Sequence, residues 1–543
     1  MLPSAKSYEE LREKFQWDIP EFFNIGVDIC DKWADKDAAR EALIFAEEDG
    51  PTTTYTFGDL KKLSNQLANL LLSQGISRGD RVGILLPQAP ETAFSHIAIH
   101  KLGGISIPLF SLFGEEALEY RLENSGAKAL ITNNAGAEKL AKIRDSLPEL
   151  ELILNIEGTD FGTRPLHAEM ARQSEDFTPV KTKAEDPAII IYTSGTTGQP
   201  KGALHAHRTL LGHLPGVEMP HNMFPKEGDR FWTPADWAWI GGLIDVLLPS
   251  LHHGIPVVAC RFKKFSGEAA FQLMQDLKIR NAFIPPTALK MMRQVENPKD
   301  RWNYSLRSLG SGGEALGAEL IQWGQDTFGL TISEFYGQTE CNLVVSTCAE
   351  LMETRPGVTG KAVPGFDVQI VDDKGTVLEA GQLGNIGVRA PNPVMFLQYW
   401  NNPEATKKKF SGDFLITGDK GVMDKDGWIQ FVGRDDDVIT SSGYRIGPGE
   451  IEDCLLKHDT VAMAGVIGKP DKLRTEIVKA YIVLKEGVEP SDELAKELSD
   501  FVKQRLAAHE YPRELEFVEA LPMTTTGKVI RRELRARAID EEV

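Results

Sequence analysis

Short apolar runs alternate with amphipathic stretches over the first two thirds of the chain, and this alternation restricts the possible folds more than any other feature. Thr56 is suited to cap a helix whose leucines recur at helical spacing, and Gly75 is suited to end it. Residues 82–86, 129–132 and 189–192 are apolar and of strand length. Because strands that alternate with helices form parallel sheets covered by helices, the sequence predicts an α/β fold.

The pattern changes after about residue 359. Residues 366–371 alternate apolar and polar side chains, and turn-forming residues follow them, which favours an antiparallel β region. An acidic run at 433–437 then precedes a shorter tail. The tail has two strand-like segments and a helical pattern over 491–506 with Ser491 as its cap, so we expect it to be a small α+β unit.

The composition excludes some classes of partner. The chain has 543 residues, and 60 Lys and Arg stand against 79 Asp and Glu, which gives a net charge of −19. A chain this acidic is not expected to hold nucleic acid on a general basic surface. Five cysteines are scattered without a Cys-x-x-Cys pair, which argues against a disulfide framework and against a cysteine-ligated zinc site.

The N-terminal segment has no apolar core of signal-peptide length, since residues 1–6 lead directly into the charged stretch 9–14. The apolar runs elsewhere are strand-sized, whereas a membrane-spanning helix needs about 20 apolar residues. We therefore expect no membrane span and a location in a reducing compartment, the cytoplasm.

A loop rich in glycine and hydroxyl side chains follows the apolar run that ends at residue 192. Glycines let backbone N–H groups approach an anion closely, hydroxyls donate hydrogen bonds to phosphate oxygens, and a lysine adds charge. The loop is not a Walker A motif, because Lys201 is followed by Gly202 and not by Ser or Thr. A Gly/Thr-rich surface turn is the alternative, but the position after a buried strand favours a phosphate site. The expected phosphate-binding residues are Thr193, Ser194, Gly195, Thr196, Thr197, Gly198 and Lys201.

Further motifs follow this loop along the chain. They are Gly312-Gly313-Glu314, Tyr336-Gly337-Gln338-Thr339-Glu340, Thr417-Gly418-Asp419, Gly433-Arg434-Asp435-Asp436-Asp437 with Ser442-Gly443-Tyr444-Arg445, and Thr526-Gly527-Lys528. Together they resemble, in content and order, the signature of the AMP-forming adenylate synthetases, which include acyl-CoA synthetases, peptide-synthetase adenylation domains and firefly-type luciferases. The resemblance covers nearly the whole chain and looks strongest for short- and medium-chain acyl-CoA synthetases.

The resemblance implies a domain organisation. It implies a large N-terminal adenylation domain at 1–433, built from two helix-covered β-sheets and a β-barrel-like subdomain. A hinge at 434–436 would connect this domain to a small, mobile α+β domain at 437–543.

The resemblance also implies a reaction in two halves that uses ATP, Mg²⁺ and coenzyme A. A carboxylate and ATP first form acyl-AMP and pyrophosphate, and the thiol of coenzyme A then displaces AMP. Because two anions must be neutralised and aligned, such a site needs cations. It needs no covalent nucleophile of the enzyme, because the carboxylate itself attacks ATP. This fits the lack of a Gly-x-Ser-x-Gly elbow in the chain.

Each motif carries over a role from the family. Glu340 is expected to hold Mg²⁺, which prefers hard oxygen ligands. Asp419 and Arg434 are expected to bind the ribose, Tyr336 to stack on the adenine, and Thr339 to reach the α-phosphate. The other nucleotide-binding positions implied by the resemblance are Gly313, Glu314, Ala315, Glu334, Phe335 and Gly337.

The C-terminal motifs suggest how the two halves of the reaction are connected. Lys528 lies on a Gly-containing loop that could reach the carboxylate and the α-phosphate together, so it is expected to be catalytic with Lys201 and Thr339. Asp436 matches the family's hinge position. The loop expected at the coenzyme A channel consists of Gly443, Tyr444 and Arg445.

The acyl pocket is expected around segment 233–242, which matches the family's Thr-Ala-Asp-x-Gly-Trp block imperfectly. Trp237 is expected to gate this pocket, and Trp239 to be structural core. Gly337 would leave space where acetate-specific members of the family carry Trp, and Cys341 is expected to line the pocket. The sequence therefore favours a short- to medium-chain acid longer than acetate, with branched and methylthio-substituted propionates as candidates.

Two other functions use the same adenylate. One is a stand-alone adenylation enzyme that loads a carrier protein, and the other is a luciferase-like oxidoreductase. Gly310-Ser311-Gly312 resembles the start of a dinucleotide fingerprint, but no acid at matching spacing follows, which argues against NAD. The expected partners are the acid, ATP and coenzyme A, and a homodimer is compatible with the resemblance.

Overall fold

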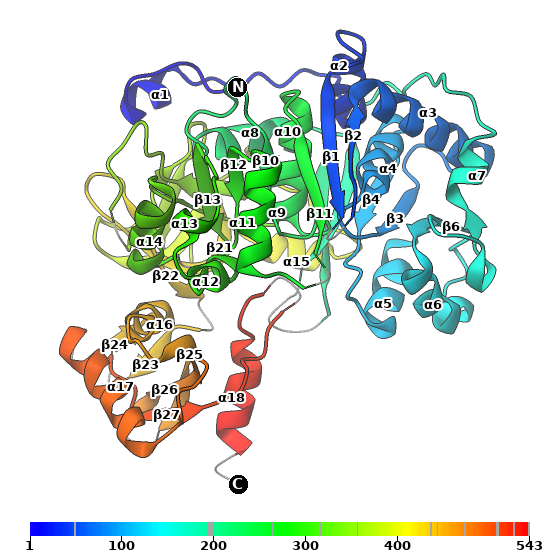
Figure 1. Ribbon diagram of the computed structural model, residues 1–543. Helices are drawn as coiled ribbons and strands as arrows, with labels where there is room; N and C mark the ends of the chain where they lie inside the picture. Colours follow the sequence, from blue (N-terminus) through cyan, green and yellow to red (C-terminus); the bar gives the residue numbers. More distant parts are fainter. Residues whose placement is uncertain are drawn as a thin grey trace.

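The computed structural model describes residues 1–47, 50–193, 199–262, 264–314, 316–355, 357–434, 437–441, 444–471, 474–506, 510–524 and 527–540. Of residues 440, 444, 445 and 540 it describes the backbone alone. The chain forms a large unit of three sheets and a smaller C-terminal unit with a sheet of its own, as the sequence predicted (Figure 1).

The first large sheet has eight strands, and its interior is parallel. Only the pairs β8–β9 and β9–β19 at one edge run antiparallel within it. From that edge, the strands are β19 (Gln398–Tyr399), β9 (Lys201–Ala206), β8 (Pro187–Thr193), β4 (Ile105–Pro108), β3 (Arg81–Leu85), β5 (Ala129–Thr132), β6 (Leu152–Asn155) and β7 (Arg164–Pro165). The apolar runs of the sequence are thus β3, β5 and β8, and their parallel pairing confirms the α/β prediction.

The second large sheet has nine strands, with antiparallel pairs at both edges and parallel strands between. In order, they are β16 (Lys361–Ala362), β15 (Asn342–Ser346), β14 (Ser333–Gln338), β13 (Ser308–Gly312), β12 (Asn281–Phe283), β10 (Phe231–Trp232), β11 (Val257–Arg261), β1 (Glu41–Glu47) and β2 (Thr52–Thr56). This sheet joins strands from both ends of the N-terminal half and from the middle of the chain.

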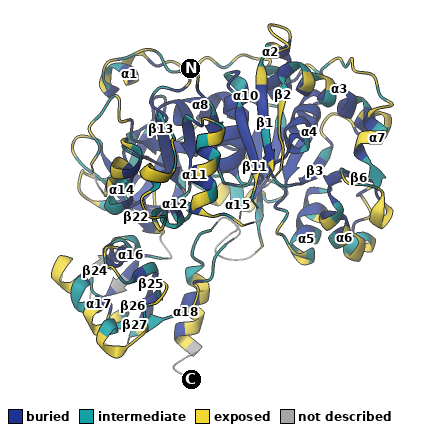
Figure 2. Cartoon of the chain, viewed as in Figure 1, coloured by how far each residue is buried: buried dark blue, intermediate teal, exposed yellow. Residues whose placement is uncertain are grey.

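Helices cover the two large sheets and share a core with them. Helix α3 (Phe57–Ser73) starts at a capping box of Thr56 and Asp59, and Gly75 follows its end with a φ of 83°. Both ends agree with the sequence prediction. One hydrophobic cluster contains residues of both sheets and of two helices between them, for example Ile84, Val257, Leu67 and Ile97. Figure 2 shows most strands of the two large sheets in the colour of buried residues.

The remaining helices are mostly short. Those of the large unit are α1 (Tyr8–Lys14), α2 (Lys32–Ala34), α4 (Pro90–Lys101), α5 (Glu115–Ser125), α6 (Asn134–Ile143), α7 (Leu166–Met170), α8 (Thr209–Glu218), α9 (Ile240–Gly242), α10 (Leu248–His252), α11 (Gly267–Asp276), α12 (Pro286–Arg293), α13 (Pro298–Arg301), α14 (Ala318–Phe328) and α15 (Pro403–Lys408). Among the described residues, none of the helices combines the length and the apolar character needed to cross a bilayer.

The antiparallel β region predicted after residue 359 is a five-stranded sheet. Its strands are β17 (Val368–Val371), β18 (Leu383–Arg389), β21 (Phe414–Met423), β20 (Phe410–Ser411) and β22 (Ile429–Arg434), the last paired with β21. It packs against β14 and β15 of the nine-stranded sheet through a second hydrophobic cluster. The two antiparallel strands that carry Asp419 and Arg434 therefore lie beside the strand that carries Tyr336.

The C-terminal unit is the small α+β structure expected from the tail. Its sheet contains β24 (Tyr444–Ile446), β23 (Ile439–Ser441), β26 (Thr475–Leu484), β25 (Val461–Asp471) and β27 (Glu514–Phe517). Its helices are α16 (Pro448–Leu456), α17 (Asp492–Arg505) and α18 (Arg531–Asp540). Ser491 caps α17, as the sequence predicted, and the buried residues of this unit form hydrophobic clusters of their own.

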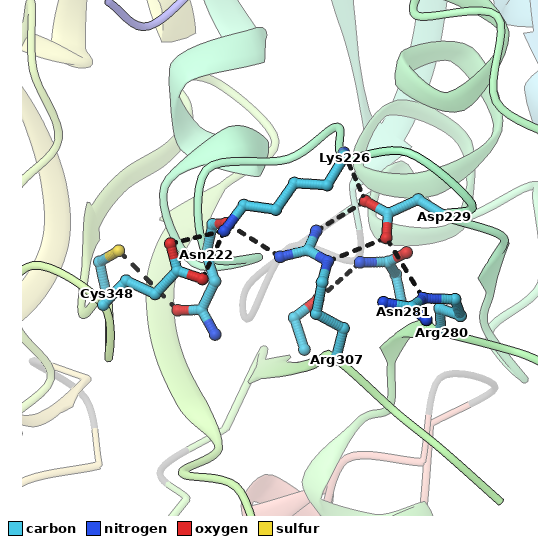
Figure 3. A network of polar contacts seen from close by, with 9 residues as sticks. Asn222, Lys226, Asp229, Arg280, Asn281, Arg307 and Cys348 are labelled. Carbon is cyan, nitrogen blue, oxygen red and sulfur yellow. Dashed lines mark hydrogen bonds and ion pairs between the residues drawn. The ribbon is translucent and has the colours of Figure 1, made fainter. Parts of the chain in front are cut away.

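A polar network stabilises the nine-stranded sheet at the amino ends of β10, β12 and β13 (Figure 3). The Asp229 carboxylate is fully buried and pairs twice with the Arg307 guanidinium, at 2.9 and 2.6 Å. Arg307 also donates to the carbonyl of Asn222 at 2.9 Å, and the Lys226 backbone N–H donates to Asp229 at 2.8 Å. Strands β13 and β14 present their other ends, the carboxyl ends, to the candidate site.

Candidate active site

Several of the expected nucleotide residues lie at or just after the carboxyl ends of strands β8, β13 and β14 in the two large sheets, which is where ligands bind in open α/β sheets. Asp419 and Arg434 come from the five-stranded sheet. Strand β8 ends at Thr193, directly opposite Lys201 at the start of β9. The Thr193 hydroxyl donates to the Lys201 carbonyl at 3.4 Å. The tip of the phosphate loop, Ser194, Gly195, Thr196, Thr197 and Gly198, lies outside the described residues.

Tyr399 brings Lys201 and Glu340 together. The Tyr399 hydroxyl donates to the Glu340 carboxylate, and the ammonium of Lys201 lies 5.3 Å from the centre of the Tyr399 ring. Glu340 is buried, and its carbonyl accepts from the Phe396 N–H at 2.9 Å. Burial, together with the nearby Glu340 carboxylate, raises the pKa of the Tyr399 hydroxyl, so Tyr399 stays a hydrogen-bond donor.

Asp419 is the centre of the second part of the site. It is buried on β21 and accepts from the Tyr336 hydroxyl at 2.6 Å. Arg434, its register partner on β22, lies with Nε 3.6 Å from the other carboxylate oxygen. Burial raises the pKa of Asp419, while Arg434 and the Tyr336 hydrogen bond oppose that rise. The Tyr336 ring tilts against Phe431 at 5.8 Å.

Lys528 reaches this region from the C-terminal unit. Its loop is docked by Thr287 of α12, whose hydroxyl donates to the Gly527 carbonyl at 2.8 Å and contacts Glu314 at 3.3 Å. Burial lowers the pKa of the Lys528 ammonium, and the charges of Glu314 and Asp419 act against that effect. The structure therefore brings the C-terminal lysine to the large unit's nucleotide residues.

Trp239 is the aromatic side chain that lines this part of the site, and the sequence reasoning missed it. The Lys528 ammonium lies 5.8 Å from the centre of the Trp239 ring. A side-chain carbon at Gly313, whose φ is 96°, would lie 3.3 Å from that ring and 3.5 Å from Lys528 Cε. Trp237, expected to gate the pocket, is fully buried within the large hydrophobic cluster.

The structure therefore places Trp239, and not Trp237, beside Lys528, and Trp239 also packs against the large hydrophobic cluster. The signal that could have identified Trp239 is its place in the Thr-Ala-Asp-x-Gly-Trp block, where it aligns with the Trp and Ala238 replaces the Gly. Asp236 of the same block accepts from the Ala238 N–H at 2.8 Å, and burial raises the pKa of this carboxyl to about 6.

The structure gives a reason for glycine at position 337 that differs from the expected space for an acyl chain. A side-chain carbon at this position would lie 1.6 Å from the Asn342 carbonyl oxygen, at an irregularity in the β14–β15 pairing. Backbone therefore fills the space that the sequence argument assigned to an acyl chain. Cys341, expected beside it, packs in the second hydrophobic cluster, where burial raises the pKa of its thiol to about 12.

The other residues expected at the nucleotide, on β14 and in the turn after it, differ in how far their side chains are buried. The Phe335 side chain is buried, and a side-chain carbon at Gly312 would lie 2.4 Å from its ring. Only the backbone of Phe335 therefore faces the site. Glu334 is buried, and its burial and the nearby Asp453 raise its pKa to about 7. Thr339 is partly buried in the turn that follows β14.

Part of the expected site lies outside the described residues. Ala315, Asp436 and Gly443 lie outside the described residues, as do the side chains of Tyr444 and Arg445. The backbone of Tyr444 pairs with Ser441 in the β23–β24 hairpin. This hairpin belongs to the same C-terminal unit as Lys528.

The described residues contain no group of three His, Cys, Asp or Glu side chains arranged to hold a metal ion. A metal at Glu340 would therefore take most of its ligands from elsewhere. This suits Mg²⁺, which accepts one or two carboxylates and completes its shell with phosphate oxygens and water.

Comparison with known proteins agrees with this geometry. The family model of the AMP-binding enzymes matches residues 30–400, and the model of their C-terminal domain matches residues 450–528. The chain is 35% identical to the acetyl-coenzyme A synthetase of Bacillus subtilis, over 98% of this chain and 95% of that one. It is also 35% identical to the human mitochondrial acyl-coenzyme A synthetase ACSM3, over 98% and 92%.

A solved structure is similar over the full length. The anthranilate CoA ligase AuaEII, in complex with anthranoyl-AMP, superposes with a TM-score of 0.89 at 30% identity, over 97% of this chain and 99% of that one. The chain therefore belongs to the AMP-binding enzyme family and is an AMP-forming acid–CoA ligase, an enzyme class that uses ATP, Mg²⁺ and coenzyme A.

Proposed function

We propose that the acid is a short- to medium-chain carboxylic acid longer than acetate, with branched and methylthio-substituted propionates as candidates. The observation that supports this proposal is the meeting of Trp239, Gly313 and Lys528. An apolar ring beside an ammonium group suits such an acid, because the carboxylate can pair with the cation while the hydrocarbon part contacts the indole. Phe283, which lies 5.6 Å from the Trp239 ring, extends the apolar surface.

The first half-reaction would use the cations that surround Asp419. A carboxylate oxygen attacks the α-phosphorus of ATP, the bond from that phosphorus to the bridging oxygen breaks, and pyrophosphate leaves. Lys528 would pair with the attacking carboxylate and the α-phosphate, reducing the repulsion between them. Asp419, held by Tyr336 and Arg434, would accept hydrogen bonds from the ribose hydroxyls.

Glu340 would hold the metal. When bound, Mg²⁺ neutralises phosphate charge and so makes the α-phosphorus easier to attack. The Tyr399 hydrogen bond fixes the Glu340 carboxylate beside the loop that ends at Lys201. Thr339, next to Glu340 in the same turn, would reach the α-phosphate.

The second half-reaction would require a different position of the C-terminal unit. The sulfur of coenzyme A attacks the acyl carbonyl carbon, and the bond to the AMP oxygen breaks. We infer domains at 1–433 and 437–543 with a hinge at 434–436 that includes Asp436. The separate hydrophobic clusters of the C-terminal unit support this division. Gly443, Tyr444 and Arg445 would then approach the acyl-AMP.

The test is ATP–pyrophosphate exchange with a panel of carboxylates from acetate to octanoate, including isobutyrate and methylthiopropionate. We expect exchange without coenzyme A, with AMP as the nucleotide product and a maximum at acids longer than acetate. A maximum at acetate would contradict the proposed acid, and ADP as the obligatory product would contradict the adenylate mechanism.

Transfer to free coenzyme A distinguishes the ligase from an enzyme that loads a carrier protein. Relatives over the full length of the chain are named as coenzyme A synthetases, which favours free coenzyme A. We expect the thioester to form with free coenzyme A at a rate comparable to adenylation. Formation only with an added carrier protein would favour the alternative.

We also propose that the enzyme is located in a reducing compartment, the cytoplasm. A homodimer is compatible with the family resemblance. None of the five cysteines, all within the described residues, forms a disulfide, and all five are buried. Cell fractionation tests the location, and light scattering of the purified enzyme gives its oligomeric state.

A further inference from the structure

Three lysines gather around a hollow beside the Lys201–Tyr399–Glu340 contact. The hollow measures about 390 Å³ and is lined by Lys201, Tyr399, Asn402, Glu404, Ala405, Lys408 and Lys409. Glu404 is the acidic side chain among them. We call this hollow the lysine pocket.

Two carboxylates act near the three lysines without pairing with them, since Glu404 lines the pocket and the charge of Lys409 opposes the raised pKa of Asp419. Among the described residues, no carboxylate forms an ion pair with Lys201, Lys408 or Lys409 within 4 Å. The Lys201 ammonium instead faces the Tyr399 ring, and the Lys409 ammonium donates to the Thr417 carbonyl at 3.1 Å. Like charges placed together are unfavourable unless an anion joins them, and here they occur in a chain of net charge −19.

The backbone around the pocket is held by hydrogen bonds to the phosphate-loop strand. The Trp400 N–H donates to the Gly202 carbonyl at 2.7 Å, and the Asn402 side chain caps α15 by accepting from the Ala405 N–H. Lys408 ends α15, so its ammonium is carried by an element anchored to β9 through β19. The pocket is therefore a fixed part of the site's outer wall.

We propose that the lysine pocket binds the inorganic pyrophosphate that adenylation releases, with Lys408 as its outermost cation. The inference rests on the proposed function. Tyr399 forms one wall of the pocket and also contacts Lys201, which is expected to bind phosphate, and Glu340, which is expected to hold Mg²⁺. A pyrophosphate that leaves the α-phosphorus would meet three cations that form no ion pair with a carboxylate of the described residues. The second hollow next to Lys201 is lined by Asn and aromatic side chains and offers no further cation.

Lys408→Gln in the full-length enzyme tests the proposal. The enzyme is assayed by ATP–pyrophosphate exchange with the best acid of the panel, at varied pyrophosphate. Because a charge-assisted contact is worth about one power of ten in affinity, we expect the KM for pyrophosphate to rise about ten-fold. Product inhibition by pyrophosphate should weaken to the same extent, and Lys408→Arg should restore both values.

Lys407→Gln is the matched control. Lys407 is the exposed neighbour on the same helix and does not line the pocket, so this variant loses the same charge. We expect it to keep the wild-type KM for pyrophosphate. An equal KM in Lys408→Gln and Lys407→Gln would overturn the proposal.

Two further readouts decide which anion the pocket binds. An equal rise in the KM for ATP would assign Lys408 to the bound triphosphate, and a rise for coenzyme A alone would assign it to that substrate's phosphates. Either result overturns a pyrophosphate site. Thermal stabilisation of the wild type by pyrophosphate alone, lost in Lys408→Gln, tests binding without turnover. Absence of exchange in the wild type with every acid would instead contradict the proposed function.

Discussion

Lys528 is the residue that connects the two units of the chain at the candidate site. It belongs to the C-terminal unit but lies beside Trp239 and is held near Glu314 through Thr287. The motif at its loop predicted a lysine near the nucleotide from sequence alone. The docking by Thr287 could not be predicted, because Thr287 belongs to no motif and lies far from Lys528 in sequence.

Lys528→Ala should separate the two half-reactions. The variant removes a cation that is needed only while the carboxylate attacks ATP, so adenylation should slow about 100- to 1,000-fold. Thioester formation from supplied acyl-AMP should slow less than about ten-fold. Single-turnover rates of each half measure the effect. Equal losses in both halves would contradict the assignment of Lys528 to adenylation.

The sequence argument linked Gly337 to the choice of acid, whereas the structure links it to the stability of the fold. A side-chain carbon there would overlap the Asn342 carbonyl oxygen, so Gly337→Ala should lower the free energy of unfolding by about 1–3 kcal/mol. Gly337→Trp should be still less stable. Urea unfolding measures both, with Gly158→Ala as the control, because a carbon at Gly158 meets nothing within 4 Å. A stable Gly337→Trp enzyme that prefers acetate would restore the pocket argument.

The sequence indicates which residue types a site needs, but it does not indicate which of two similar neighbouring side chains faces the site. The family motifs selected Lys201, Glu340 and Asp419 as candidates for phosphate, metal and ribose binding, and the structure brings Lys201 and Glu340 to the same side chain, Tyr399. The motifs could not decide which of Trp237 and Trp239 faces Lys528, since both are large apolar residues in one loop. The path of the backbone between Thr233 and Ile240 decides that.

At the scale of elements, the sequence predicted where helices begin but not which strands pair in the sheets. Thr56 and Ser491 cap their helices as expected, because a capping side chain acts within four residues. The order of the nine-stranded sheet has no comparable local signal, because β1 pairs with β11 across more than 200 residues of sequence. The polar network of Asp229 at the amino ends of these strands was also not predicted.

Asp229→Asn tests how strongly that network holds the strands together. The change leaves the mostly buried Arg307 guanidinium without its carboxylate, so the free energy of unfolding should fall by about 3–5 kcal/mol. Asp413→Asn is the control, because Asp413 pairs with Arg389 on the exposed surface, where solvent screening leaves such a pair little effect on stability. Urea unfolding measures both, and equal effects would show that the network adds little.

At the scale of the whole molecule, the core contains many buried histidines. Burial lowers the pKa of His96, His205 and His221 to about 3 and that of His207 to about 4, and it holds the pKa of His100 well below the usual value. In the unfolded chain these groups titrate near 6.5. Between the two values the unfolded chain binds more protons, so stability falls as the pH drops below about 6.5.

Buried carboxyls with raised pKa values act in the opposite direction. The pKa of Glu334 is raised to about 7, and those of Asp236 and Asp453 to about 6, so their protonation as the pH falls from 7 toward 4 favours the folded state. The raised pKa values of Asp245, Asp419 and Glu450 act in the same direction. The histidine shifts are larger than those of Glu334, Asp236 and Asp453, and the lowered pKa values of His253 and Glu218 add to the loss of stability in acid. We therefore expect a net loss of stability below pH 6.5.

His205→Gln isolates one histidine of this set. It removes a group that can charge only after unfolding, so the slope of the unfolding free energy against pH, between 6.5 and 4.5, should decrease by up to about 1.4 kcal/mol per pH unit. Urea unfolding at four pH values between 7.5 and 4.5 gives that slope. His167→Gln is the matched control, because His167 is exposed, and it should keep the wild-type slope. If both variants keep it, protons reach His205 in the folded protein, and the acid sensitivity of the fold has its source elsewhere.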